Sequence, residues 1–183
     1  MLTICDILSA LNLMTSKTVR RRNPPLPCPS PFTAMMRIFL AGIMQGSHTE
    51  AVLHEQDYRA RIKELIARHL PEAEVYDPLA DHEKSLEYGE RKGRDVFFQH
   101  NLMCREVEVL LAFVPSASMG TAIEMWEAYG HGAVVVTISP LKLNWAVKFL
   151  SHILYADLEE FSAALQDGSL RKRIEEIRST VTE

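Results

Sequence analysis

The sequence predicts an α/β fold, a three-layer flavodoxin-like or Rossmann-like parallel sheet of four to five strands with helices on both faces. From residue 37 onward, short apolar runs alternate with longer segments of helical spacing. Glycine ends the first apolar run, and proline follows each of the others within two residues. The 183 residues, 47% of them hydrophobic, can bury one core. Because strands that alternate with helices are joined by right-handed crossovers, we expect them to run parallel.

The apolar runs predict four strands. Each run is short and ends at a turn residue, as buried strands of a parallel sheet do. The runs lie at residues 38–42, 73–76, 107–114 and 133–138.

Helical spacing of apolar residues predicts the connecting segments. In residues 51–70, Tyr58, Ile62 and Leu65 fall on one face, and Pro71 ends the helix. The further helices are predicted at residues 96–106, 121–129, 144–153, 157–166 and 169–181. Residues 79–94 are polar and rich in His, Glu, Lys and Gly, which predicts a long ordered loop beside a site.

Residues 1–35 differ from the rest of the chain. Five prolines between residues 24 and 31 exclude regular helix or sheet in that segment. We therefore expect 1–35 to be a disordered or non-native extension, and 36–183 to be the functional domain with its C-terminal helices. The alternative is that the amphipathic stretch from Ile4 to Leu13 binds a membrane surface or a partner protein.

Charge is unevenly divided along the chain. Residues 1–35 contain four basic residues against Asp6 alone, a net charge of +3, so the rest of a chain with a total of −4 carries −7. An acidic domain argues against a nucleic-acid partner and is compatible with a small-molecule substrate. The cysteines (Cys5, Cys28 and Cys104) are odd in number and widely spaced, which predicts reduced thiols in a cytoplasmic protein. No apolar run approaches the ~18 residues that would span a membrane.

The most informative segment is Ser118-Met119-Gly120-Thr121-Ala122-Ile123-Glu124, which follows the predicted strand at 107–114. In parallel sheets, ligands bind beyond the carboxyl ends of the strands. Free N–H groups at a helix start, together with the Ser118 hydroxyl, can hold an anion, and Glu124 lies one turn further along. The alternative is that Ser118 or Thr121 only caps the helix and that Glu124 is a solvated first-turn acid.

This segment, with Ala128 after it, resembles the nucleoside 2-deoxyribosyltransferase family, whose relatives include 2′-deoxynucleoside 5′-phosphate N-hydrolases. Phe39-Leu40-Ala41-Gly42 and the strand at 107–114 add to the resemblance, which covers roughly residues 37–165. The Gly-Thr-(x)2-Glu core also occurs in cytokinin riboside phosphate phosphoribohydrolases. The Pro-Gly-Gly that precedes it in those enzymes is missing here.

The resemblance implies that Glu124 attacks the anomeric carbon or stabilises the oxocarbenium ion. It also implies a nucleoside 5′-monophosphate as substrate, because Ser118 stands where an acid would repel the phosphate. Asn144 matches an asparagine that reaches a neighbouring subunit's sugar site, which implies a homodimer or larger homo-oligomer with composite sites; the alternative is that Asn144 caps the next helix. The remaining expected substrate contacts are Gly42, Gly46, Ser47, Asp77, Asp95, Asn101 and Gly120.

Three positions depart from the family pattern. Gln45 stands where an arginine is frequent, and Phe39 lies in the first strand where a tyrosine is common. His100 stands in the place of an aspartate that assists at the base. The histidine either protonates the leaving base, as a second catalytic residue, or is an ordinary helix-surface residue.

The sequence therefore predicts an enzyme that cleaves the N-glycosidic bond of a (deoxy)nucleoside 5′-monophosphate. The alternatives are a nucleoside 2-deoxyribosyltransferase that exchanges bases and a non-catalytic nucleotide-binding or sensing module. We expect no metal and no organic cofactor, because the histidines lack the spacing of metal ligands. The expected partners are a nucleotide or nucleoside and further copies of the chain, with no nucleic acid and no membrane.

Overall fold

The computed structural model describes residues 35–45 and 52–181. By its contacts the chain divides into residues 1–32 and 33–183, and the described residues belong to the second unit. The predicted extension at residues 1–35 lies outside the described residues, apart from Met35. In the described part of the chain, no helix has the length and apolar character that a membrane span requires.

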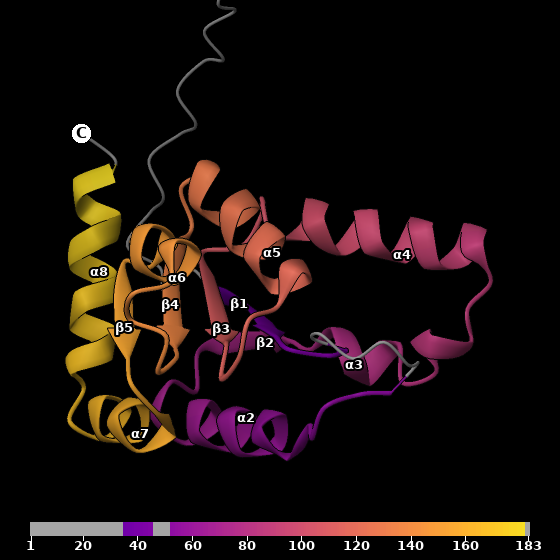
Figure 1. The fold of residues 1–183 in the computed structure, drawn as a ribbon. Helices are drawn as coiled ribbons and strands as arrows, with labels where there is room; N and C mark the ends of the chain where they lie inside the picture. The colour runs from indigo at the N-terminus through magenta and orange to yellow at the C-terminus, as the bar shows by residue number, and fades with distance from the viewer. Residues whose placement is uncertain (1–34, 46–51, 182–183) are drawn as a thin grey trace, which may run out of the picture. The chain divides into compact units, whose positions relative to one another are not determined.

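A five-stranded parallel sheet carries the fold, as the sequence predicts (Figure 1). The strands are β1 (Met36–Gly42), β2 (Ala73–Tyr76), β3 (Val109–Phe113), β4 (Val134–Ile138) and β5 (Ile153–Tyr155). Their order is β2-β1-β3-β4-β5, with Phe39 opposite Tyr76 and Gly42 opposite Phe113. The order reverses between β1 and β3, so the crevice beyond their carboxyl ends is the place where such folds bind ligands.

Helices cover both faces of this sheet (Figure 1). One face packs against α2 (Asp57–His69), α7 (Leu158–Gln166) and α8 (Ser169–Val181). The other face packs against α4 (Glu90–Met103), α5 (Met119–Gly130) and α6 (Trp145–Leu150). In β1, Ile38 and Leu40 enter the first apolar core, whereas Phe39 and Ala41 enter the second. A strand buried on both faces needs the continuous apolar run that the sequence has here.

Three sequence-based boundaries are wrong. The helix predicted at 51–70 begins at Asp57, and residues 52–56 before it are not helical. The segment 79–94 is not a loop, because it contains α3 (Pro78–Asp81), the 3₁₀ turn η1 (Ser85–Glu87) and the first turn of α4. Glu90 and Arg94 form an ion pair of 2.8 Å in that first turn. The helix predicted at 144–153 ends at Leu150, where the Ser151 hydroxyl donates to the Val147 carbonyl at 2.6 Å, and the short strand β5 follows.

Candidate active site

Ser118 begins α5 just beyond the carboxyl end of β3. Its hydroxyl oxygen accepts hydrogen bonds from the Thr121 N–H at 3.4 Å and from the Thr121 hydroxyl at 3.0 Å. Ser118 is therefore the N-cap of α5. The N–H groups of Met119 and Gly120 have no acceptor within the helix, so the helix start can still hold an anion. A Cβ at Gly120 would meet nothing within 4 Å, so packing does not require glycine there.

Glu124, one turn into α5, is only partly accessible to solvent. Burial raises the pKa of its carboxyl to about 8, and the positive charge of Arg59 opposes that shift. The charge of Glu124 also adds to the effect of burial in raising the pKa of Tyr58 to about 12 and that of the Cys104 thiol. Glu124 therefore lies in a poorly solvated neighbourhood with Arg59, Tyr58 and Cys104, and is not a fully solvated first-turn acid.

Arg59 is the buried cation whose charge opposes the rise in the pKa of this carboxyl. Its side chain comes from α2 and is only 3% exposed. The guanidinium donates to the Leu40 carbonyl at 3.0 Å and to Asp77 Oδ1 at 2.9 Å. Asp77 is buried too, and its carboxylate also accepts from Lys63 at 2.8 Å and from the Leu79 N–H at 3.2 Å. The structure thus places Asp77, an expected substrate contact, in an ion-pair network that joins the ends of β1 and β2 to α2.

Gly42, the last residue of β1, lies against the hydroxyl end of the Tyr58 side chain. A Cβ built on Gly42 would be 2.2 Å from the Tyr58 hydroxyl oxygen. The Tyr58 ring stacks on Phe113 at the end of β3, with ring centroids 4.2 Å apart, and its hydroxyl donates to the Ile43 carbonyl at 3.4 Å. Position 42 therefore requires glycine because the Tyr58 side chain packs directly against its Cα. This packing requirement is independent of any contact between the Gly42 backbone and a phosphate.

His100, from α4, lines a cavity of about 220 Å³ with Gln45, Pro78, His82 and Tyr88. Its Nε2 lies 3.3 Å from the Tyr76 hydroxyl. Burial and the neighbouring His82 lower the pKa of His100 to about 4, while the charge of Asp81 opposes that shift. The imidazole is therefore neutral at pH 7 and carries one ring proton.

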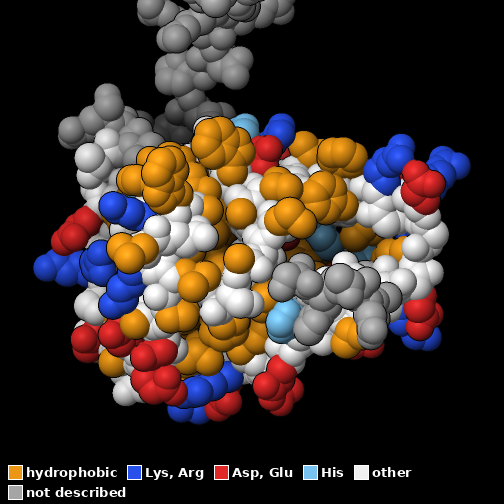
Figure 2. Space-filling model, viewed as in Figure 1, with side chains coloured by type: hydrophobic (Ala, Val, Ile, Leu, Met, Phe, Trp, Pro, Cys, Tyr) orange, Lys and Arg blue, Asp and Glu red, His pale blue; other side chains and the backbone are white. Residues whose placement is uncertain are grey.

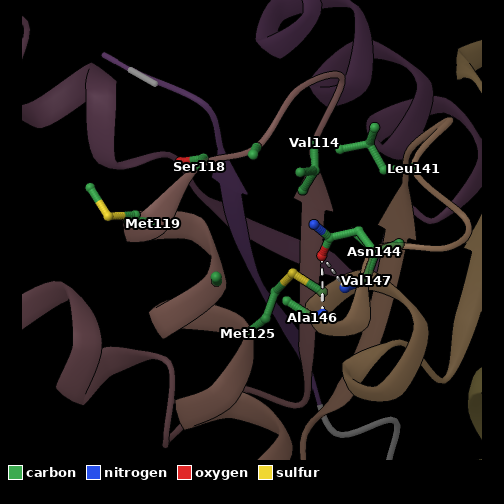
Figure 3. Close-up of a pocket in the computed structure, with 10 residues that line it drawn as sticks. Val114, Ser118, Met119, Met125, Leu141, Asn144, Ala146 and Val147 are labelled. Atoms are coloured by element: carbon green, nitrogen blue, oxygen red, sulfur yellow. Dashed lines mark hydrogen bonds between the residues drawn. The ribbon is translucent and has the colours of Figure 1, made fainter. Parts of the chain in front are cut away.

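Asn144 and Ser118 line a second cavity, of about 370 Å³, between the start of α5 and the start of α6 (Figure 3). The walls of this cavity are mostly apolar, with Val114, Met125 and Leu141 among them. The Asn144 Oδ1 accepts from the N–H groups of Ala146 at 3.0 Å and Val147 at 3.4 Å. Asn144 is therefore the N-cap of α6, and within residues 35–45 and 52–181 its Nδ2 makes no hydrogen bond.

The remaining expected contacts lie in different surroundings. Asn101 is 7% exposed; its Nδ2 donates to the Phe97 carbonyl at 2.8 Å, and its Oδ1 is buried without a hydrogen-bond partner in the described part of the chain. Asp95 is exposed and borders a shallow depression with Arg91 and Lys92. Gly46 and Ser47 lie outside the described residues.

The structure thus brings some of the predicted residues together and separates others. Ser118 and Asn144 share one cavity, His100 lines another, and Glu124 lies with Arg59 and Tyr58. Sequence reasoning missed Arg59, since an arginine beside the apolar face of a helix carries no signal of burial. Asp77 directly follows a predicted strand, and a buried carboxylate needs a cationic partner. This requirement was the signal in the sequence that could have led to Arg59.

Among residues 35–45 and 52–181, no three His, Cys, Asp or Glu side chains gather in a way that could hold a metal ion.

Comparisons with known proteins agree with the fold. No family model and no curated protein matches the sequence. The 2-deoxyribosyltransferase from the psychrotolerant bacterium Bacillus psychrosaccharolyticus matches with a TM-score of 0.52 and 21% identity, over 70% of this chain and 95% of that one. A CMP N-glycosidase, BcmB, from Clostridium botulinum has a TM-score of 0.42 and 21% identity, over 73% of this chain and 98% of that one. A conserved protein from Enterococcus faecalis V583 has a TM-score of 0.43 and 22% identity, over 80% of this chain and 99% of that one. The chain therefore has the fold of a 2-deoxyribosyltransferase, the fold that the resemblance of residues 37–165 implies.

Proposed function

We propose that the chain cleaves the N-glycosidic bond of a (deoxy)nucleoside 5′-monophosphate, with Glu124 as the nucleophile or as the group that stabilises the oxocarbenium ion. The observation that carries the proposal is the poorly solvated carboxyl of Glu124, one turn from a free helix start and near the sheet position where ligands bind. The fold shared with a 2-deoxyribosyltransferase makes this chemistry a reasonable expectation for the site.

The reaction proceeds in two balanced steps. A carboxylate oxygen of Glu124 attacks C1′ as the C1′–N bond breaks, and the bonding pair leaves with the base, which takes up a proton. Water then attacks C1′ and breaks the new C1′–O bond, which frees the sugar phosphate, returns the carboxylate and releases a proton. A carboxylate suits this route because positive charge develops on the sugar in both steps.

The helix start of α5 provides the site for the 5′-phosphate. The N–H groups of Met119 and Gly120 and the Ser118 hydroxyl would donate hydrogen bonds to the phosphate, and the positive end of the helix dipole favours its negative charge. Arg59 cannot serve as a free phosphate ligand, since its guanidinium is occupied by Asp77 and the Leu40 carbonyl. We therefore assign recognition of the phosphate to these uncharged N–H and O–H donors. Replacement of Ser118 by an acid should then weaken phosphate binding.

A panel of deoxynucleotides, ribonucleotides and nucleosides, assayed for free base, tests the proposal. Glu124→Ala should reduce base release by at least ~10³-fold, as removal of a covalent nucleophile does. Glu127→Ala, on the same helix, is the matched control, because Glu127 pairs with Arg105 at the surface. Absence of base release from every member would refute cleavage. Exchange between two bases without hydrolysis would favour the transferase, and tight nucleotide binding without turnover would favour the binding module.

The pH dependence of base release is a second test of Glu124. With a pKa of about 8, most of the carboxyl is protonated and non-nucleophilic at pH 7. The value of kcat/KM should therefore rise as the pH increases from 6 through 8 and should level off only above about pH 9. A profile that is flat over this range would argue against Glu124 as the attacking group.

We also propose that the chain forms a homodimer or larger homo-oligomer through α5 and α6. Apolar side chains gather over these two helices (Figure 2), including Met119, Trp126 and Trp145, which are 83%, 65% and 78% exposed. Contiguous exposed apolar surface of this kind marks interaction sites. Analytical ultracentrifugation should find an oligomer that Trp145→Glu dissociates, and a monomer for the unchanged chain would contradict the proposal.

A further inference from the structure

The edge strand β5 is held to β4 by a side chain as well as by its backbone. β5 has only three residues, and His152 comes immediately before it. The His152 N–H donates to the Val135 carbonyl at 2.9 Å. In return, the Val135 N–H donates to Nδ1 of the His152 ring at 3.0 Å. The imidazole thus adds one hydrogen bond between β4 and the start of this short strand.

This hydrogen bond determines which form of the His152 ring fits. A backbone N–H can only donate, so the ring nitrogen that faces Val135 must present a lone pair. The proton of the neutral ring is therefore on Nε2. A protonated imidazole carries an N–H on both nitrogens, so protonation would place a second donor opposite the Val135 N–H and break the bond.

The surroundings of the ring also disfavour its charged form. The His152 ring is half-buried and stacks on Tyr129 of α5, with ring centroids 5.0 Å apart and 17° between the planes. Lys148, one turn earlier in α6, lies over the ring of Phe149 at 5.2 Å. Burial lowers the pKa of His152, and no neighbouring charge contributes to that shift.

The bond to Val135 cannot be replaced while β5 stays in place. Val135 is 0% exposed, so water cannot reach its N–H, and a buried donor without an acceptor is costly. Water can enter only if the start of β5 moves away from β4. The preceding residue, Ser151, ends α6 and hydrogen-bonds the Thr137 hydroxyl of β4 at 2.7 Å, so the same movement would release the end of α6.

We infer that His152 is a pH-sensitive switch: its neutral ring holds β5 and the end of α6 to β4, and protonation of the ring releases them. The switch goes beyond the proposed function, since it needs neither substrate nor turnover. The folded state binds this proton more weakly than the unfolded state does. The stabilisation by His152 is therefore complete above the ordinary histidine pKa of about 6.5 and is lost as the pH falls through the lowered value.

Hydrogen exchange of the Val135 amide, measured by NMR, tests the switch in the unliganded chain. Leu111 in the central strand β3 is the internal reference, because its amide reports global unfolding. Between pH 7 and about pH 4.5, the protection factor of Val135 should fall at least about tenfold relative to that of Leu111, the value of one lost hydrogen bond. Equal changes at the two amides would overturn the inference.

Two substitutions of His152 separate its acceptor from its charge. His152→Asn places an amide oxygen near the position of Nδ1 and cannot titrate, so Val135 should stay protected at both pH values. His152→Phe keeps a ring on Tyr129 but has no acceptor, so Val135 should exchange rapidly at both. His131→Asn is the control, because His131 is 45% exposed and its Nδ1 bonds the Glu127 carbonyl, and it should keep the pH dependence. A pH dependence that persisted in His152→Asn would also refute the switch.

Discussion

The hydroxyl of Tyr58 lies over the Cα of Gly42 so closely that no side chain fits between them. A Cβ at Gly42 would be 2.2 Å from the phenol oxygen and 3.0 Å from the ring carbon that carries it. The ring cannot easily move away, because it is 7% exposed and stacks on Phe113 at 4.2 Å. The absence of a side chain at Gly42 therefore lets Tyr58 of α2 pack against the end of β1.

Gly42→Ala should consequently destabilise the protein. The added methyl overpacks a rigid contact, which costs on the order of 1–3 kcal/mol in the free energy of unfolding. Urea denaturation of Gly42→Ala, Tyr58→Phe and the double variant measures it. The double variant should recover part of the loss, because removal of the hydroxyl removes the shortest contact. Strictly additive effects would show that the two residues do not interact as described.

Arg59 and Asp77 form the buried ion pair beside the site, with side-chain exposures of 4% and 6%. Arg59→Met would leave a buried carboxylate with Lys63 as its only cationic partner in the described structure. The free energy of unfolding should fall by about 3–5 kcal/mol, as it does when one partner of a buried pair is removed. Arg61→Met is the control, since Arg61 pairs with Glu159 at the exposed surface, where such pairs contribute about 1 kcal/mol or less. Equal losses for the two variants would contradict the buried network.

Glu124 should make stability fall as the pH rises. Its pKa in the folded chain is about 8, above the ordinary value of 4.5, so the folded state holds this proton more tightly than the unfolded state. The resulting stabilisation is complete below about pH 4.5 and is lost as the pH rises through 8, an effect of up to about 5 kcal/mol. Glu124→Gln removes the titration, so its melting temperature should exceed that of the unchanged chain by a margin that grows from pH 5 to pH 9.

Glu127→Gln is the matched control for that experiment, because it removes one carboxylate from the same helix in its ion pair with Arg105. If the margin of Glu124→Gln did not change with pH, the carboxyl of Glu124 would not have the raised pKa that its burial implies. The pH profile of stability is independent of any substrate and tests the site even where turnover is absent.

How far the sequence predicts this structure depends on how local the signal is. The strand at 38–42 can be predicted from its own residues alone, because a strand covered on both faces is hydrophobic throughout. The three-residue strand β5 is too short for any periodicity, and the exposed first turn of α4 has no apolar face to detect. In the candidate site, the helix cap formed by Ser118 can be predicted because it involves Thr121, only three residues further along the chain. The contact between Arg59 and Asp77 joins positions 18 apart, and only the packing of α2 against the sheet brings them together.

Asn144 allows its two interpretations to be separated by one pair of variants. Its Oδ1 caps α6 through Ala146 and Val147, and its Nδ2 is the group that could reach a sugar in a neighbouring subunit. Asn144→Ala removes the cap and should cost about 1 kcal/mol of stability. Asn144→Asp keeps a capping oxygen but loses the amide donor, so stability should be retained while base release falls at least about tenfold, the value of one lost hydrogen bond.

If each site combines Glu124 of one subunit with Asn144 of its neighbour, the Asn144→Asp variant allows a second test. In a dimer that joins one Asn144→Asp chain with one Glu124→Ala chain, one of the two sites receives both native residues, because each comes from a different subunit. Random mixing of the two impaired proteins should therefore restore full activity in about a quarter of all sites. If Asn144→Asp kept the full rate, Asn144 would be a cap and no more. If that variant were inactive and mixing restored nothing, Glu124 and Asn144 would act within one subunit, and the proposed exchange of residues between subunits would be wrong.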